Sequence, residues 1–75
     1  MPELRRVSGE EAIKALERLG FRRVRQRGSH VILKKSTPAG DVGCVVPLHG
    51  QLKVGTLDGI LKLAKAEVED FLRNL

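Results

Sequence analysis

Aromatic residues are nearly missing from this chain, which has two phenylalanines and neither tyrosine nor tryptophan. Proteins that stack splayed nucleobases on exposed aromatic rings need more such side chains, so this mode of base recognition is excluded. The single cysteine, Cys44, rules out an intramolecular disulfide and lies in an apolar run, so we expect it to be buried. No apolar run approaches the roughly 20 residues that a membrane-spanning helix needs.

Carboxylates are scarce in the middle of the sequence, where Asp41 is the only one between Glu17 and Asp58. A divalent metal site built from several carboxylates is therefore hard to assemble, and His30 and His49 do not form a metal-binding pattern. The sequence also has no P-loop and no dinucleotide-binding motif. Serine or cysteine nucleophiles would lack an assembled base. The sequence therefore predicts no metal ligands and no small-molecule cofactor.

The chain is short and basic. Its 75 residues allow one domain, over 1–75, with a modest core and no deep pocket. The formal net charge of +5 favours a polyanionic partner, which is a nucleic acid, an acidic protein or an anionic membrane surface. The stretch 1–7 has no apolar run and is not expected to be a signal peptide. We therefore expect a soluble, cytoplasmic protein.

Apolar residues at helical spacing predict three helices. The first covers 9–19, with Ser8 as N-cap and Glu11 completing a capping box. The second covers 55–65, and a short third helix covers 66–75.

Between the first two helices, β-branched and apolar residues predict three strands, and Arg27-Gly28 is a plausible tight turn. The strands are expected over 22–26, 29–35 and 42–46, with a loop over 36–41 and irregular structure over 48–54. Pro47 should end the third strand because it cannot donate to a ladder. The expected fold class is α+β, a three-stranded antiparallel sheet covered on one face by helices.

The predicted hairpin register pairs Gln26 with Ser29, so that Val24 lies opposite Val31 and Arg25 opposite His30. In this register the covered face of the sheet carries Val24, Val31 and Leu33. The open face carries Arg23, Arg25, His30, Ile32 and Lys34.

His30 is the leading candidate for a catalytic residue. Gly28-Ser29 precede it and give a substrate close access to the backbone, while Arg25 and Lys34 are expected beside it. An imidazole among cations suits removal of the proton from an RNA 2′-hydroxyl, with the cations holding the phosphate. The competing interpretation is a solvated histidine without a role. His49 is either a second acid–base group or phosphate contact, or an exposed loop residue.

Four blocks stand out in order along the chain: Gly20-Phe21, Arg25-Gln-Arg-Gly-Ser-His30, Val45-Val-Pro-Leu-His49 and Gly55-Thr-Leu-Asp-Gly-Ile-Leu-Lys62. Together they resemble the HicA (YcfA-like) mRNA interferase toxins, over nearly the whole chain from the Ser8 capping box to Phe71. The resemblance implies a double-stranded-RNA-binding-domain-like fold, α-β-β-β-α, to which the segment 66–75 adds a short helix.

The resemblance also implies an activity and a partner. It implies the toxin of a type II toxin–antitoxin system, an endoribonuclease that cleaves mRNA without a known cofactor, with His30 as the essential catalytic residue. A HicB-like antitoxin would neutralise it by covering the active face. The residues expected to bind RNA are Arg23, Arg25, Arg27, Ser29, Lys34 and His49.

Two other interpretations stay open at this point. One is a non-catalytic module that binds double-stranded RNA through phosphates and 2′-hydroxyls, with a strong salt dependence. The other is an interaction protein whose basic face docks an acidic partner. Replacement of His30 would change little in the RNA-binding module.

Overall fold

The computed structural model describes residue 4 and residues 6–75. Positions 1–3 and 5, which belong to the stretch not expected to be a signal peptide, lie outside the described residues. The elements in chain order are α1 (Gly9–Arg18), β1 (Arg22–Arg27), β2 (His30–Thr37), β3 (Gly40–Pro47), α2 (Val54–Ala64) and α3 (Val68–Arg73). The strands form one antiparallel sheet in the order β1-β2-β3. The predicted α+β layout, with its short final helix, is confirmed.

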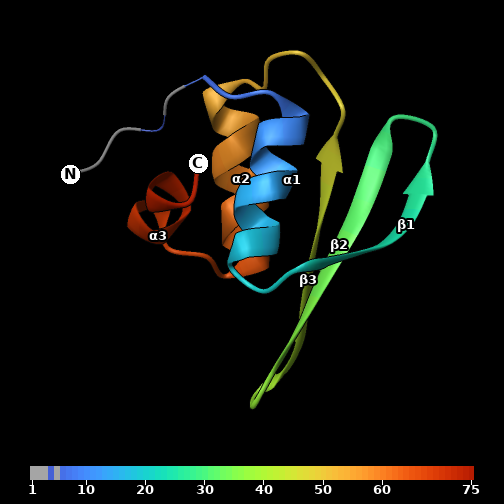
Figure 1. Ribbon diagram of the computed structural model, residues 1–75, viewed down its shortest axis with the longest axis vertical. Helices are drawn as coiled ribbons and strands as arrows, with labels where there is room; N and C mark the ends of the chain where they lie inside the picture. Colours follow the sequence, from blue (N-terminus) through green and yellow to red (C-terminus); the bar gives the residue numbers. More distant parts are fainter. Residues whose placement is uncertain (1–3, 5) are drawn as a thin grey trace.

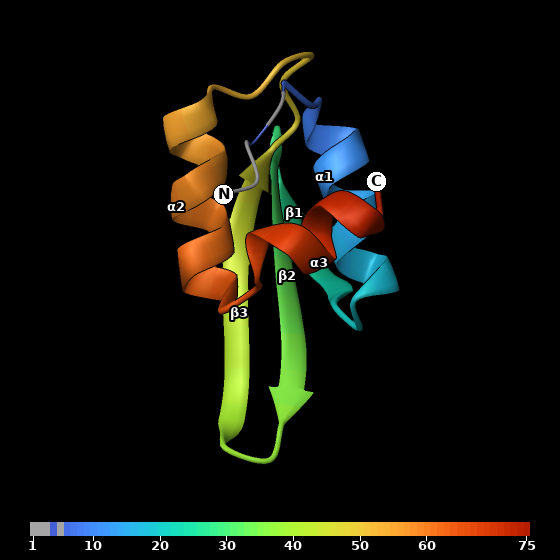
Figure 2. The same cartoon turned by 90° about the vertical axis from the view of Figure 1, so that its left-hand side faces the viewer.

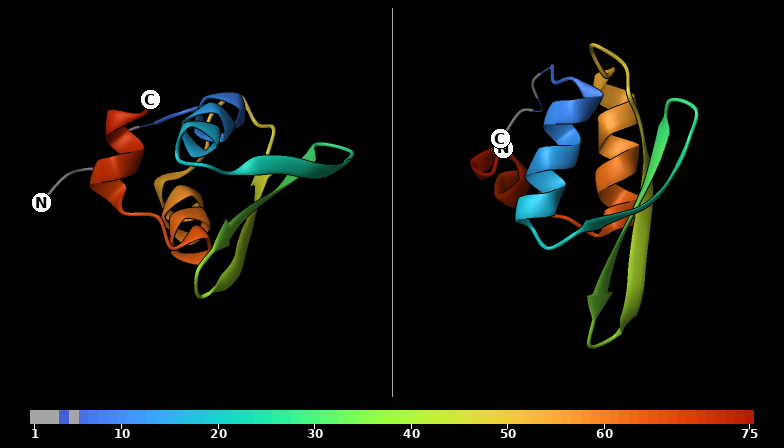
Figure 3. Two further views of the ribbon diagram at one scale, coloured as in Figure 1. Left: turned by 60° about the horizontal axis from the view of Figure 1, so that its bottom comes forward. Right: turned by 45° about the vertical axis from the view of Figure 1, so that its right-hand side comes forward.

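All three helices lie on one side of the sheet. α1 and α2 stand side by side against it, and α3 crosses them on the side away from the strands (Figures 1 and 2). Between these layers Val31 and Leu33 of β2 and Cys44 and Val46 of β3 are buried in the core. Because side chains alternate along a strand, the residues between them project from the other face. No element of the described part of the chain covers that face, which we call the open face (Figure 3).

Helix α1 begins and ends as its sequence dictates. The Glu11 amide donates to the Ser8 hydroxyl oxygen at 3.0 Å, and the Ser8 amide donates to the Glu11 carboxylate at 2.9 Å. This confirms the predicted capping box. At the other end Gly20 adopts a positive φ of 104°, and the Phe21 amide donates to the Leu16 carbonyl at 3.0 Å. The positive φ of Gly20 therefore ends α1, and the chain continues into β1.

The register of the β1–β2 hairpin differs from the prediction by two residues. Arg27, not Arg25, lies directly opposite His30. The loop consists of Gly28 and Ser29 rather than Arg27-Gly28, and Gly28 has a φ of 57°. Two-residue hairpins favour turns in which glycine takes the first position with positive φ, so Gly28-Ser29 forms the tighter connection. A shift of two residues leaves each side chain of the turn region on its predicted face.

A β-bulge changes the faces at the start of β1. The ladder shifts between Arg23 and Arg25, which leaves Val24 as the extra residue. Val24 was predicted on the covered face, but it is 43% exposed. Arg23 was predicted on the open face, but it lies toward α1, where its guanidinium contacts Glu10 at 2.9 Å and Glu17 at 3.6 Å. One inserted residue reverses the alternation, which explains both errors.

The remaining segments differ from the prediction mainly in length. β2 and β3 run through most of the predicted loop 36–41 and leave only 38–39 as a turn, across which Thr37 donates to the Gly40 carbonyl at 2.5 Å. This hairpin extends past the ends of the helices (Figure 1). β3 ends at Pro47, one residue beyond the predicted end, and the segment 48–53 is irregular, one residue shorter than predicted. α2 begins one residue earlier than expected and ends where Lys65 adopts a φ of 52°.

Candidate functional site

His30 is the first residue of β2, and its imidazole projects from the open face. The next residue, Val31, is completely buried beneath the helices, so alternation directs His30 the other way. Its neighbours across the sheet are Arg27 on β1 and Pro47 on β3. The side chain is exposed and forms no hydrogen bond or ion pair with the described residues. The imidazole is therefore free to meet a ligand.

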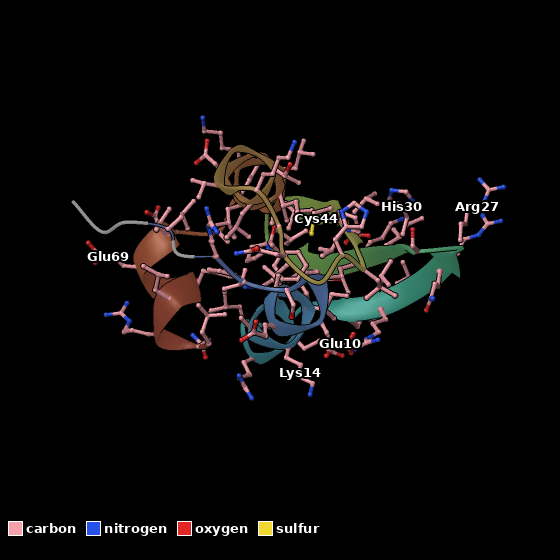
Figure 4. The ribbon with its side chains drawn as sticks, turned by 90° about the horizontal axis from the view of Figure 1, so that it is seen from above. Glu10, Lys14, Arg27, His30, Cys44 and Glu69 are labelled. Carbon is pink, nitrogen blue, oxygen red and sulfur yellow. The ribbon has the colours of Figure 1, made fainter. Side chains whose placement is uncertain are left out.

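Two arginines of β1 share this face with His30. Arg27 lies directly opposite, where Cβ atoms of antiparallel strands are about 4.5–5.5 Å apart. Arg25 pairs with Ile32 and is therefore the diagonal neighbour of His30, at about 7–8 Å. Figure 4 shows Arg27 and His30 at the same end of the molecule, well away from Lys14 on the outer side of α1. The structure thus places two arginines on the same face as His30, one directly opposite it and one diagonal to it.

Two of the predicted cations are not neighbours of His30. Lys34 is on the open face but four residues along β2, roughly 13 Å away at 3.3 Å per residue, so the prediction that it lies beside His30 is wrong. Arg23 is turned to the covered side, and its hydrogen bond to Glu10 raises the pKa of the guanidinium. Arg23 therefore anchors β1 to α1.

The segment that carries His49 runs beside the turn that precedes His30. The Leu48 amide donates to the Ser29 carbonyl at 2.6 Å, directly after the ladder ends at the His30–Pro47 pair. His49 itself is exposed, and its side chain has no hydrogen-bond partner among the described residues. Ser29 and His49 thus belong to the same corner of the molecule as His30, although they are distant in sequence from one another.

The N-terminus of α1 supports this corner from the covered side. The Gly9 amide donates to the His49 carbonyl at 2.9 Å. A Cβ atom on Gly9 would lie 2.0 Å from the Pro47 carbonyl oxygen, so only glycine allows this approach. No local pattern in the sequence shows that a distant backbone will lie against Gly9.

The Gly28-Ser29 turn is held by a side chain of β1. The Gln26 side-chain amide donates to the Gly28 carbonyl at 3.0 Å. The glycine-first pair was itself a signal for the observed register, since it suits a two-residue hairpin loop better than Arg-Gly does. The turn sets the position of Arg27 relative to His30.

Apolar side chains adjoin the cations on the open face. Ile32 and Val45 form the next cross-strand pair on the same face after His30–Pro47, and Val45 is 44% exposed. The open face therefore combines an imidazole, guanidinium groups and an apolar patch. Such a mixed surface is suited to contact with a large partner.

Cys44 lies on the opposite, covered face. It is buried in the core, as predicted, and burial raises the pKa of its thiol to about 11. A thiol in this state is a poor nucleophile. Among residue 4 and residues 6–75 there is no group of three or more histidine, cysteine or carboxylate side chains placed to hold a metal ion.

Comparison with known families decides the class of protein to which this site belongs. The family model described as the HicA toxin of bacterial toxin–antitoxin systems matches residues 9–66, which is more than half of the chain. The chain belongs to the HicA toxin family. The match extends from α1 through α2 and includes the hairpin, His30, the His49 segment and Gly9.

Membership makes the protein the toxin of a toxin–antitoxin system, with an antitoxin as its partner. A search of curated proteins finds no match to the chain. Within the described residues, no helix of this HicA toxin is long and apolar enough to cross a membrane.

Proposed function

We propose that this HicA toxin is an endoribonuclease that cleaves mRNA and in which His30 is the catalytic residue. The observation that carries the proposal is the exposed imidazole of His30, directly opposite Arg27 on a face that the helices leave open. Family membership supplies the chemical context, since HicA toxins are known as RNA-cleaving proteins. The net charge of +5 favours a polyanionic substrate, and we place the reaction in the cytoplasm, where mRNA is available.

The proposed reaction is internal transfer at phosphorus. His30 takes the proton of a ribose 2′-hydroxyl, the 2′-oxygen forms a bond to phosphorus, and the bond from phosphorus to the 5′-oxygen breaks. The products are a 2′,3′-cyclic phosphate and a 5′-hydroxyl. The leaving 5′-oxygen takes its proton from a second acid, for which His49 is the candidate because its segment is hydrogen-bonded to Ser29 beside His30. No metal is required by this scheme.

The two arginines supply the electrostatic part of the mechanism. Negative charge grows on the non-bridging phosphate oxygens as the 2′-oxygen attacks, and guanidinium groups aimed at them stabilise that state. Arg27, as the direct neighbour of His30, is assigned to the scissile phosphate. Arg25 and Lys34 lie progressively farther from His30 and are assigned to flanking phosphates, with Ser29 offering its hydroxyl at the turn.

The deciding experiment compares the purified protein with its His30→Ala variant on a defined mRNA in the presence of EDTA. We expect cleavage by the first only, with cyclic-phosphate and 5′-hydroxyl ends. A 2′-deoxyribose at the cleavage site should block the reaction, because the nucleophile is then missing. Equal cleavage by both proteins, or no cleavage by either with both folded, would contradict the proposal. Duplex binding unaffected by His30→Ala would instead indicate a non-catalytic RNA-binding module.

We further propose that the antitoxin is HicB-like and that it covers the open face. The Ile32–Val45 pair beside His30, in which Val45 is exposed and Ile32 is half-buried, is the apolar centre that such an interface needs, with the arginines around it. We expect Val45→Asn, which adds no charge beside the phosphate-binding arginines, to retain cleavage but to escape inhibition by the antitoxin. Leu63→Asn, at a position 68% exposed on α2, is the matched control and should remain inhibited. Equal inhibition of the two variants would place the interface elsewhere.

A further inference from the structure

A cavity of about 440 Å³ lies where the segment after β3 joins α2. The described residues that line it are Arg6, Gln51, Leu52, Lys53 and Val54. Arg6 and Lys53 come from segments far apart in the sequence, and the Leu52 amide joins these segments by donating to the Val7 carbonyl at 2.7 Å. None of the residues assigned above to the reaction takes part in this cavity.

The lining has the chemistry of a phosphate site. Arg6 and Lys53 are exposed, and neither forms an ion pair with any described residue. The described lining residues include no carboxylate, while the Gln51 side chain offers an amide donor. The cavity also borders the first turn of α2, whose dipole adds to the positive potential. A guanidinium and an ammonium around one concave surface suit a phosphodiester.

Two other cavities lined by described residues lack this character. One of about 150 Å³ near the end of α2 is lined in part by Asp41, and one of about 110 Å³ is lined in part by Glu67 and Asp70. Both also include Lys65, so their cations are accompanied by carboxylates. Negative lining would repel a phosphate, which distinguishes these two cavities from the one at Arg6 and Lys53.

The cavity and His30 lie at the same end of the molecule. The β1–β2 turn, the N-terminus of α1 and the start of α2 all face the upper end in Figure 1, and the segment 48–53 passes between them. This segment begins at the Leu48–Ser29 hydrogen bond beside His30 and ends at Lys53 in the cavity. His49 belongs to this segment. A strand of RNA that leaves His30 along this segment therefore passes His49 and reaches Arg6 and Lys53.

We infer that this cavity is a second phosphate-binding site for the RNA strand, held by Arg6 and Lys53 at a distance from the cleaved bond. The inference rests on the proposed ribonuclease function for the identity of the ligand. It implies that on one side of the cleaved bond the bound strand crosses the end of the molecule, over the His49 segment, while on the other side it follows β2 toward Lys34. Substrate length then determines affinity, because a short RNA occupies His30 without reaching the cavity.

The test measures RNA binding. All variants carry His30→Ala in addition, so that the RNA is not cleaved during the measurement. Arg6→Gln with Lys53→Gln should weaken binding of a single-stranded 12-nucleotide RNA roughly tenfold and leave dinucleotide binding unchanged. The slope of log affinity against log salt should fall by about 0.7 for each phosphate that the variant no longer neutralises. Lys14→Gln with Lys65→Gln removes the same charge elsewhere and is the matched control. Lys53→Arg, which keeps the charge, should retain binding.

An equal loss of affinity in the two double variants, or no loss in either, would overturn the inference. Circular dichroism of each variant separates these outcomes from misfolding. If the parent protein fails to cleave RNA but the Arg6 and Lys53 changes still weaken binding selectively, the proposed catalysis fails and the phosphate site stands. If it cleaves RNA while these changes leave binding of long RNA intact, only the phosphate site fails.

Discussion

The Gly9 amide at the start of α1 donates to the carbonyl of His49 at 2.9 Å, and this hydrogen bond joins the helical layer to the corner that holds His30. The close approach depends on the missing side chain of Gly9, since a Cβ there would lie 2.0 Å from the Pro47 carbonyl oxygen. The backbone of β3 cannot yield as a flexible side chain would. The position of the candidate site thus depends on a glycine with no chemistry of its own.

Gly9→Ala should therefore destabilise the protein, although alanine normally stabilises a helix relative to glycine. We expect a decrease of about 1–3 kcal/mol in the free energy of unfolding from overpacking. Gly59→Ala in α2 is the matched control, because no atom outside the neighbouring backbone of α2 lies within 4 Å of its Cβ position, and it should gain about 0.5–1 kcal/mol. Urea denaturation measures both. A gain in stability for both variants would show that the packing around Gly9 is not tight.

Arg27→Ala should reduce kcat/KM for RNA cleavage roughly 100-fold, the scale expected when one donor to a developing oxyanion is removed. Lys34→Ala should have a much smaller effect. Its distance of roughly 13 Å from His30 exceeds the Debye length of about 8 Å at physiological ionic strength. Steady-state kinetics on one RNA substrate compares the two. A larger effect at Lys34 would indicate that this hairpin register does not describe the RNA-bound protein.

Arg23→Ala should affect stability rather than catalysis. The residue was expected to bind RNA, but its guanidinium contacts Glu10 and Glu17 on α1 instead. Both ion pairs are partly exposed, so we expect a decrease of about 0.5–1 kcal/mol in the free energy of unfolding. The value of kcat/KM should stay unchanged below the unfolding transition. If the folded Arg23→Ala variant lost cleavage activity, Arg23 would bind RNA and this prediction would be wrong.

Cys44 should make the protein less stable in alkaline solution. Burial raises the pKa of its thiol to about 11 in the folded state, above its ordinary value of 9.0. Between about pH 9 and pH 11 the unfolded chain loses the thiol proton while the folded chain keeps it. The free energy of unfolding therefore falls as the pH rises. Below about pH 9 both states hold the proton and the effect vanishes. Urea titrations at neutral and at alkaline pH measure the free energy of unfolding of the protein and of its Cys44→Val variant. If the thiol is responsible, the protein should lose stability relative to Cys44→Val as the pH rises. A constant difference between the two proteins would contradict the prediction.

Short-range patterns in the sequence were sufficient for the number and order of the helices and strands and for the face of His30, although not for the lengths of β2 and β3. The capping box at Ser8 and Glu11 depends on residues within one helical turn, and the burial of Val31 beside His30 follows from alternation along a single strand. Family membership could likewise be inferred from the blocks around Gly28, His30 and His49, and the match over residues 9–66 confirms it.

The neighbours of His30 were decided only by the tertiary structure. A two-residue turn at Gly28-Ser29 brings Arg27 opposite the imidazole, and a single bulged residue, Val24, turns Arg23 away to α1. Cross-strand pairing depends on the conformation of the turn and on packing against the helices, so small local choices change every partner along the ladder. The close approach at Gly9 and the cavity at Arg6 and Lys53 join segments distant in the chain, which no local periodicity encodes.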